Sequence, residues 1–160
     1  MQWLACQGLV VLQPRRGAAV APIGVTDLQH LFELRQCLEG YAARLATERA
    51  TQAEMASMEA LLAGLRADDS TRVHIVTDGA FHAALAQNAH NKFLRATLNR
   101  LYDLNVRLWY LVLDRIGPMH AAVEQHWTVL EAITHRDGPS AEVAIRAHIA
   151  EFHDRIRAVI

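Results

Sequence analysis

Apolar residues recur every three or four positions along most of the chain, which is the spacing of one face of an α-helix. The first apolar stripe follows Thr26 and contains Leu28, Leu31, Phe32, Leu38, Ala42 and Leu45. The sequence TQAE begins at Thr51 and has the spacing of a capping box, so it starts a second helix that continues to about Arg66. The chain between Thr26 and Arg66 is therefore predicted to form two helices.

Four more helical segments follow, each bounded by residues that favour turns. The expected ranges are about 71–87, 92–114, 118–135, and from 139 or 140 to the C-terminus. The sequences ADDS, NAHN, RIGP and RDGPS stand at the boundaries of these ranges. Pro118 suits the first turn of the fifth helix. Six helices joined by short turns predict an all-α fold, an antiparallel helical bundle.

Residues 1–25 follow a different pattern. Two apolar runs rich in β-branched residues, LVVL and AAV, are separated by Pro14, Arg15, Arg16 and Gly17. Such runs favour strands, and the proline and glycine between them favour a turn, so a short β-hairpin with a basic tip is predicted. A hairpin of two strands is only marginally stable alone. We therefore expect a small unit at 1–25 that leans on another element, and a main all-α domain at 26–160.

The composition fits one domain of this kind. The chain has 160 residues, and the 52% that are hydrophobic are enough for one substantial core. It carries 16 Lys and Arg against 17 Asp and Glu, so no strong net charge favours nucleic acid or a membrane surface. Cys6 and Cys37 form no metal motif or disulfide framework, and neither a signal peptide nor a membrane span is evident. The protein is expected to be soluble and cytoplasmic.

Two polar residues interrupt the apolar face of the third predicted helix. Asp78 and His82 are four positions apart, so they lie on one face, which also carries Phe81 and Leu85. Taken alone, an ion pair within the helix explains them most simply.

His126 and His148 occupy similar positions within the apolar stripes of the fifth and sixth helices. Three helices thus direct a carboxylate or an imidazole toward a common interior. Burying an ionised aspartate and three imidazoles is unfavourable without compensation, and a divalent metal suits one oxygen and three nitrogen ligands. Asp78, His82, His126 and His148 are therefore a candidate site for zinc, nickel, manganese or iron. The alternative is that the histidines are core residues satisfied by hydrogen bonds.

The remaining histidines do not fit this pattern. Five of them lie in turns, near helix ends or off the apolar stripes, and are expected to face solvent: His30, His90, His120, His135 and His153. His74 precedes Asp78 by one helical turn and could contact the ligands, but a surface position is favoured.

Arg35 and Asn105 each interrupt an apolar stripe at a position where a core residue belongs. An inward arginine needs an anion, and its planar group matches a carboxylate in two-point contact. An ion pair with Glu39, one turn later, is the alternative for Arg35, and a satisfied interhelical hydrogen bond is the alternative for Asn105. Beside a metal, the two residues would outline a cavity for a small organic acid.

Three stretches of the sequence resemble a known family of ligand-binding domains. They are DLQHLFELRQCLEGYAARLATERAT, DGAFHAALAQNAHNKFL and EQHWTVLEAITHRDGPSAEVAIRAHI, and together they span about residues 26–157. They contain the motifs R-x-x-L-E, D-x-x-x-H and H-x-x-x-L-x-A-I, followed by a histidine 22 residues after the last motif begins. This combination is similar to the FCD domain of GntR-family transcription factors of the FadR branch. The resemblance implies a bundle of about six helices that binds an effector and forms a homodimer.

The resemblance also implies roles for individual residues. FCD domains with this pattern hold a divalent metal, here expected to be zinc first, and the family's ligands fall on Asp78, His82, His126 and His148. The family's inward arginine falls on Arg35, where it would contact the carboxylate of a small effector. The implied function is that of a metabolite-responsive transcriptional regulator.

The N-terminal sequence WLACQGLVVLQPRRGAAVAPI is similar to the end of a recognition helix and the β-wing of a winged helix-turn-helix. Arg15, Arg16 and Gly17 would then lie at the wing tip, near the DNA backbone or minor groove. A solvated basic turn is the alternative. The first two helices and most of the recognition helix are expected to be missing, so DNA binding is expected only of a chain with the complete motif.

A metal-dependent, hydrolase-like enzyme is the main competing function, because a metal with open positions can activate water. Against it, no general base is evident besides the ligands. Glu124 and Glu131 flank His126, but the pattern does not require either of them to face inward.

Overall fold

The computed structural model describes residues 2, 5, 10–21, 25–65, 70–112, 115 and 120–159. It divides into two compact units, residues 1–30 and 31–160. The described residues contain a two-stranded hairpin and six helices, which confirms the predicted fold class. No helix in these ranges is both long enough and apolar enough to cross a membrane.

The N-terminal unit contains the predicted hairpin. Strands β1 (Val10–Gln13) and β2 (Gly17–Val20) pair antiparallel, with Gln13 opposite Gly17. The N–H of Arg16 donates to the carbonyl of Gln13 at 3.0 Å and closes the turn. Positive φ values of 62° at Arg15 and 91° at Gly17 give the chain its reversal. Arg15, Arg16 and Gly17 are exposed at the tip, and most of the expected end of a recognition helix lies outside the described residues.

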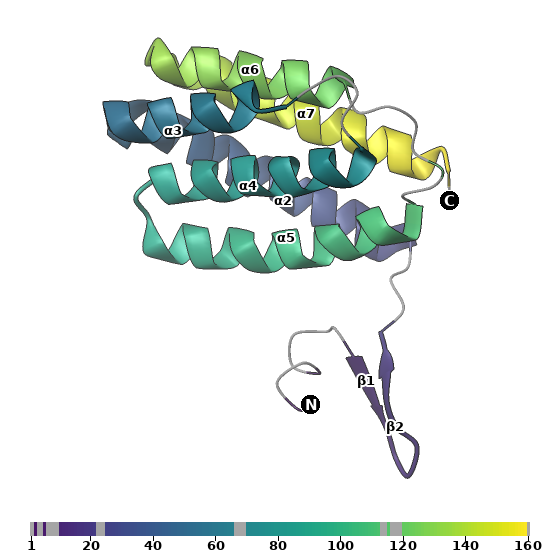
Figure 1. The fold of residues 1–160 in the computed structure, drawn as a ribbon. Helices are drawn as coiled ribbons and strands as arrows, with labels where there is room; N and C mark the ends of the chain where they lie inside the picture. The colour runs from purple at the N-terminus through teal and green to yellow at the C-terminus, as the bar shows by residue number, and fades with distance from the viewer. Residues whose placement is uncertain are drawn as a thin grey trace. The chain divides into compact units, whose positions relative to one another are not determined.

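The described part of the chain contains six helices, of which the first begins in the N-terminal unit and continues into the main unit (Figure 1). They are α2 (Val25–Arg49), α3 (Gln52–Ala63), α4 (Thr71–Asn88), α5 (Lys92–Val112), α6 (His120–Thr134) and α7 (Gly138–Arg157). Helix α4 packs against α3, α5 and α6, and α6 packs along α7. Helix α2 contacts α7 through the rings of Phe32 and Phe152, whose centroids are 5.7 Å apart. Side chains of α3, α5 and α6 can therefore meet those of α4.

Local capping explains where several helices begin. Thr51 and Glu54 form the predicted capping box at the start of α3. At the start of α7, the side chain of Asp137 accepts a hydrogen bond from the N–H of Ser140 at 3.0 Å. Asp137 is thus the cap in place of the expected Pro139 or Ser140 start, and α3 ends at Ala63, short of the expected end near 66. The expected start at Pro118 lies outside the described residues.

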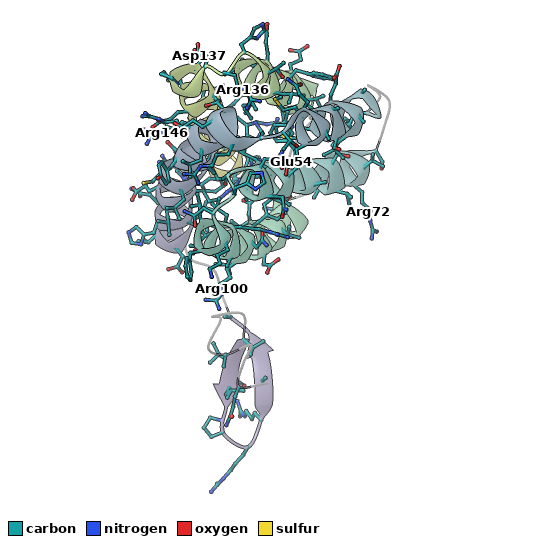
Figure 2. All side chains as sticks on the ribbon, turned by 90° about the vertical axis from the view of Figure 1, so that its left-hand side faces the viewer. Glu54, Arg72, Arg100, Arg136, Asp137 and Arg146 are labelled. Carbon is teal, nitrogen blue, oxygen red and sulfur yellow. The ribbon has the colours of Figure 1, made fainter. Side chains whose placement is uncertain are left out.

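Several polar side chains are buried among the apolar residues of the bundle interior. Charged residues such as Arg72, Arg100 and Arg146 project from the outside of the bundle (Figure 2). The buried polar residues are Arg35, Glu39, Thr47, His74, Asp78, His82, Asn88, Asn105, His126 and His148. Most of these come from α2, α4, α6 and α7, and they include every metal ligand proposed from the sequence.

The expected exposure of the other histidines is confirmed for His30, His90 and His135. It is wrong for His74, which is 5% exposed. It is also wrong in part for His153, which is half-buried because its ring stacks on Phe32 with centroids 4.7 Å apart. The side chain of His120 lies outside the described part of the chain.

A close approach between α4 and α5 depends on Gly79. An added Cβ at Gly79 would lie 2.7 Å from Cε1 and Cζ of Tyr102, a half-buried ring on α5. At Gly40 on α2, an added Cβ would instead meet Nε of Arg146 at 2.8 Å, and that exposed side chain can move. We expect Gly79→Ala to destabilise the fold by about 1–3 kcal/mol through overpacking.

Gly40→Ala serves as the matched control for this substitution. It should be neutral or stabilise the fold by up to about 1 kcal/mol, because alanine favours the helix. Urea unfolding of both variants measures the difference. Equal stability of the two variants would contradict the packing described here.

Candidate metal centre

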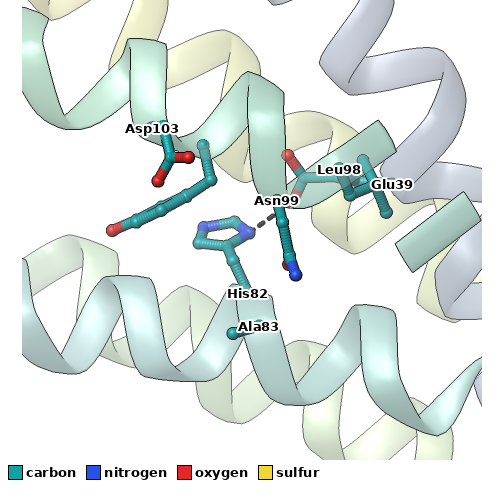
Figure 3. Close-up of a pocket in the computed structure, with 7 residues that line it drawn as sticks. Glu39, His82, Ala83, Leu98, Asn99 and Asp103 are labelled. Atoms are coloured by element: carbon teal, nitrogen blue, oxygen red, sulfur yellow. Dashed lines mark hydrogen bonds and ion pairs between the residues drawn. The ribbon is translucent and has the colours of Figure 1, made fainter. Parts of the chain in front are cut away.

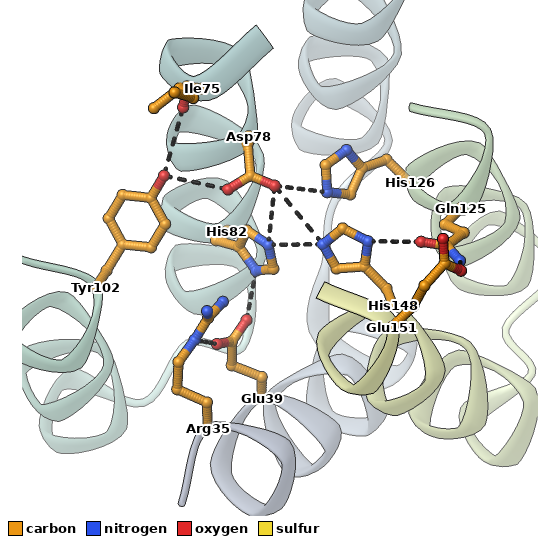
Figure 4. A network of polar contacts seen from close by, with 10 residues as sticks. All are labelled: Arg35, Glu39, Ile75, Asp78, His82, Tyr102, Gln125, His126, His148 and Glu151. Atoms are coloured by element: carbon orange, nitrogen blue, oxygen red, sulfur yellow. Dashed lines mark hydrogen bonds and ion pairs between the residues drawn. The ribbon is translucent and has the colours of Figure 1, made fainter. Parts of the chain in front are cut away.

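Four side chains from three helices converge inside the bundle. Asp78 and His82 come from α4, His126 from α6 and His148 from α7 (Figure 4). Each offers one ligand atom, and these four atoms all lie within 4.8 Å of one another. All four residues are buried, with between 2% and 5% of each exposed. The structure therefore brings together the four ligands proposed from the sequence.

The separations between these atoms fit a common ion. Oδ1 of Asp78 lies 3.5 Å from Nε2 of His82, 3.4 Å from Nε2 of His126 and 3.6 Å from Nε2 of His148. The Nε2 atoms of His82 and His148 are 3.2 Å apart. Bonds of about 2.0–2.2 Å to one ion place neighbouring ligand atoms roughly 3.0–3.6 Å apart. The donor atoms thus have the spacing of ligands around a transition metal.

His82 and His148 each have a hydrogen-bond partner behind the ring. Nδ1 of His82 is hydrogen-bonded to Oε2 of Glu39, and Oε1 of Glu39 accepts a hydrogen bond from Nε of Arg35 at 2.7 Å. Nδ1 of His148 lies 3.0 Å from Oε1 of Gln125. In the neutral form of each imidazole, a proton on Nδ1 leaves Nε2 with a free electron pair that faces the cluster, as metal-binding histidines require.

His126 differs from the other two imidazoles. Both of its ring nitrogens are buried without a hydrogen-bond partner among the described residues, and Nε2 lies 3.4 Å from Oδ1 of Asp78. Its ring packs against Phe81, with centroids 4.3 Å apart, and against the ring of His148, with centroids 4.4 Å apart. A buried polar atom without a partner is unfavourable. A metal ion bound at Nε2 would satisfy it, so the residues present fit a metal.

The charges of the metal-free cluster follow from its burial and its neighbours. Burial would raise the pKa of Asp78, but the surrounding histidines hold that pKa well below its usual range. Burial would lower the pKa of His82, but the carboxylates of Glu39 and Asp78 raise it to about 9. Burial lowers the pKa of His126 to about 4 and also lowers the pKa of His148. Near neutral pH, Asp78 is ionised, His82 is cationic and the other two imidazoles are neutral.

Tyr102 is a contact of the cluster that the apolar pattern did not indicate. Its hydroxyl donates to Oδ2 of Asp78 at 3.2 Å, which leaves Oδ1 facing the imidazoles. Burial and the charge of Asp78 raise the pKa of Tyr102, so its hydroxyl keeps the proton. The available sequence signal was Gly79, because a glycine inside a helix next to a candidate ligand often marks a close approach. Gln125 was also missed, and no pattern distinguishes it from a surface glutamine.

The two residues predicted to contact an effector are buried. Arg35 is 2% exposed and forms the ion pair with Glu39 that the sequence left open. Asn105 is 0% exposed, and neither of its amide atoms has a hydrogen-bond partner among the described residues. The interhelical hydrogen bond considered for Asn105 is therefore not found in this part of the chain. The effector contacts of both residues stay predictions.

A cavity of about 370 Å³ lies beside the cluster, between side chains of α2, α4 and α5 (Figure 3). His82 and Tyr102 form part of its wall, together with Glu39, Asn99 and Asp103. Because His82 and Tyr102 also contact Asp78, the cavity ends at side chains that belong to the candidate metal centre.

The fold agrees with the protein family that the sequence resembled. The FCD domain family matches residues 30–151. The chain therefore belongs to the FCD domain family.

Two relatives in Escherichia coli K12 are named as transcriptional repressors. The HTH-type transcriptional repressor RspR is 27% identical over 163 residues, which cover 98% of this chain and 70% of the relative. The galactonate operon transcriptional repressor is 29% identical over 134 residues, which cover 81% of this chain and 57% of the relative. The names of both relatives describe regulators of transcription.

Two solved structures share the fold. The E. coli protein McbR/YncC has a TM-score of 0.87 at 16% identity, covering 98% of this chain and 76% of the other. The Zn²⁺-bound FCD domain of TM0439 has a TM-score of 0.70 at 13% identity, covering 86% of this chain and 96% of the other. At these identities the likeness concerns the fold alone.

The charge state of His82 predicts how metal uptake depends on pH. Metal binding needs a neutral imidazole, and His82 with a pKa of about 9 holds a proton at pH 7.5. Binding should therefore release about one proton at pH 7.5, and affinity should rise about tenfold per pH unit until the pH approaches this pKa. Calorimetry of zinc binding in buffers with different ionisation enthalpies measures the number of protons.

Glu39→Gln provides the control for this measurement. Removing the carboxylate lowers the pKa of His82, so fewer protons should be released at the same pH. Zinc binding without proton release in the unmodified protein would show that His82 is neutral or is not a ligand.

Proposed function

We propose that this chain carries the effector-binding part of a metabolite-responsive transcriptional regulator. In this proposal Asp78, His82, His126 and His148 hold a divalent metal, and a small organic acid binds beside it. The convergence of three Nε2 atoms and one carboxylate oxygen in a buried space carries the proposal. Membership of a family of transcriptional regulators supports the regulatory role.

Zinc is the first choice for the metal. Three imidazoles and one carboxylate are donors that zinc accepts readily, and nickel, manganese and iron accept the same set. A related fold with bound Zn²⁺, the FCD domain of TM0439, is consistent with this choice. The bound metal would supply a Lewis acid with room for a further oxygen ligand.

The balance of buried charges favours an anionic effector. Without metal, the charges of Arg35 and protonated His82 cancel those of Glu39 and Asp78. With a divalent metal and a neutral His82, one positive charge remains uncompensated in the bundle. A buried charge without a counter-charge is strongly unfavourable. A carboxylate would restore neutrality, and for this reason an acid is proposed as the effector.

Arg35 is proposed to be the second contact of that carboxylate. Among the residues drawn in Figure 4, only Glu39 accepts a hydrogen bond from Arg35, through Nε. The remaining guanidinium nitrogens are the part of the group that can form a two-point contact with a carboxylate. Asn105, which is buried with unpartnered amide atoms, is proposed as a further polar contact.

Regulation requires that effector binding alters a DNA-binding arrangement. The proposed ligands lie on α4, α6 and α7, so a bound acid that shifts one of these helices also shifts its neighbours. In a homodimer, such shifts would change the spacing of two DNA-binding heads. Arg15 and Arg16 at the hairpin tip are proposed to contact the DNA backbone or minor groove in a complete winged helix-turn-helix.

A hydrolytic function is less well supported by the site. Glu124 and Glu131, the two candidate bases near His126, are both exposed. Glu39 is buried beside His82, but its two oxygens already contact His82 and Arg35. We therefore propose binding and signalling, and not catalysis, for the cluster.

Acid binding by the zinc-loaded protein tests this function. Acetate, titrated calorimetrically, should bind the zinc-loaded protein and not the metal-free protein. Arg35→Lys keeps the positive charge but removes the planar two-point contact, so it should weaken acetate binding by about tenfold or more while zinc stays bound.

Arg146→Lys is the matched control, because Arg146 is exposed, pairs with Glu142, and belongs neither to the four ligands nor to the cavity wall. Its acetate affinity should equal that of the unmodified protein. Binding that is independent of zinc, or unchanged in Arg35→Lys, would show that the carboxylate does not bind as proposed.

A further inference from the structure

The cavity beside the cluster has two chemically different ends. We call the wall formed by His82 and Tyr102, which both contact Asp78, the inner end of the cavity. The exposed residues Asn99 and Asp103 of α5 form what we call the outer end (Figure 3). An acid that is bound at the metal centre and extends past His82 and Tyr102 into the cavity would place its far end near Asn99 and Asp103.

The charges along this cavity also differ between its ends. If the proposed metal is bound, the inner end carries the excess positive charge of the metal centre, with Arg35 close by. Arg35 lies with its Cζ 6.0 Å from the centre of the Tyr102 ring. Two carboxylates line the cavity, and no lysine or arginine is found among the described residues that line it. Glu39 is paired with Arg35 and His82, and Asp103 lies at the exposed outer end. A second negative charge on an occupant would thus meet Asp103 without a lining cation to balance it.

The hydrogen-bonding groups at the outer end also favour an occupant without a second carboxylate. The carboxylate of Asp103 accepts hydrogen bonds, and the amide of Asn99 both donates and accepts them. Ala83 and Leu98 add apolar wall to the same cavity. The volume of about 370 Å³ lies within the ordinary range for small-molecule sites. Hydroxyl or ammonium groups, which can donate to Asp103, suit the outer end best.

We propose that the effector is an acid with one carboxylate and a hydroxylated or amino-bearing tail, and that Asp103 excludes acids with a second carboxylate at the far end. This inference rests on the proposed function, because the first carboxylate is taken to bind at the metal centre. It defines the class of ligand as hydroxy acids and amino acids, in contrast to dicarboxylates and tricarboxylates.

Matched pairs of acids test the inference on the zinc-loaded protein. Glycerate and tartronate, threonate and tartrate, and gluconate and glucarate each differ only by a terminal CH₂OH or carboxylate. Calorimetric titrations should show at least one monoacid that binds more tightly than acetate, with its diacid partner weaker by about tenfold. Zinc content is measured after each titration, so that removal of the metal by a diacid is recognised.

The variant Asp103→Asn isolates the residue responsible. It removes the charge with little change in shape, so the diacid should gain affinity. The difference in affinity between monoacid and diacid should narrow by about threefold or more, a modest factor because Asp103 is exposed. Asp154→Asn, on the exposed side of α7, is the matched control and should leave the gap unchanged.

The outcomes separate this inference from the function on which it rests. If acetate binds, three results overturn the inference alone. The diacids bind as tightly as their monoacid partners or more tightly, none of the longer acids binds, or the difference in affinity within a pair is unaffected by Asp103→Asn. No binding of acetate or of any other acid overturns the proposed function together with the inference.

Discussion

Asp78 carries a negative charge inside the bundle, and the surrounding elements are arranged so that this charge is compensated. One carboxylate oxygen accepts from Tyr102 at 3.2 Å, while the other faces Nε2 of His82, His126 and His148 at 3.4–3.6 Å. These last distances are too long for good hydrogen bonds. They suit four ligands that share one ion, because each bond from a ligand atom to the ion would be shorter than the distance between two ligand atoms.

This arrangement makes the site depend on nearly every layer of the bundle. Helix α4 supplies Asp78 and His82, α6 and α7 each supply one histidine, α2 supplies Glu39 behind His82, and α5 supplies Tyr102. A change in what is bound at the centre therefore acts on five helices at once. Coupling of this kind is what a ligand-responsive regulator needs, since a ligand shifts a conformational equilibrium only through contacts that differ between the states.

The sequence predicted those parts of the site that follow helical periodicity, and missed those that depend on packing between helices. Asp78 and His82 share a face because they are four residues apart, and this holds whatever surrounds the helix. The contact of Tyr102 with Asp78 arises where α5 approaches Gly79, and no periodicity within one helix specifies that approach. His74 is different, because it lies one turn before Asp78 on the same face of α4, so its burial follows the helical periodicity and the expected surface position was wrong.

The proposed metal centre requires that one metal is bound by three imidazoles and one carboxylate. Elemental analysis combined with X-ray absorption at the zinc edge measures both the stoichiometry and the ligands. We expect one zinc per chain with three imidazoles and ligand distances of about 2.0–2.2 Å. We also expect loss of the zinc in His148→Ala and its retention in His135→Ala, because His135 is exposed. Substoichiometric metal that is unaffected by His148→Ala would contradict the proposed metal centre and leave the histidines as core residues.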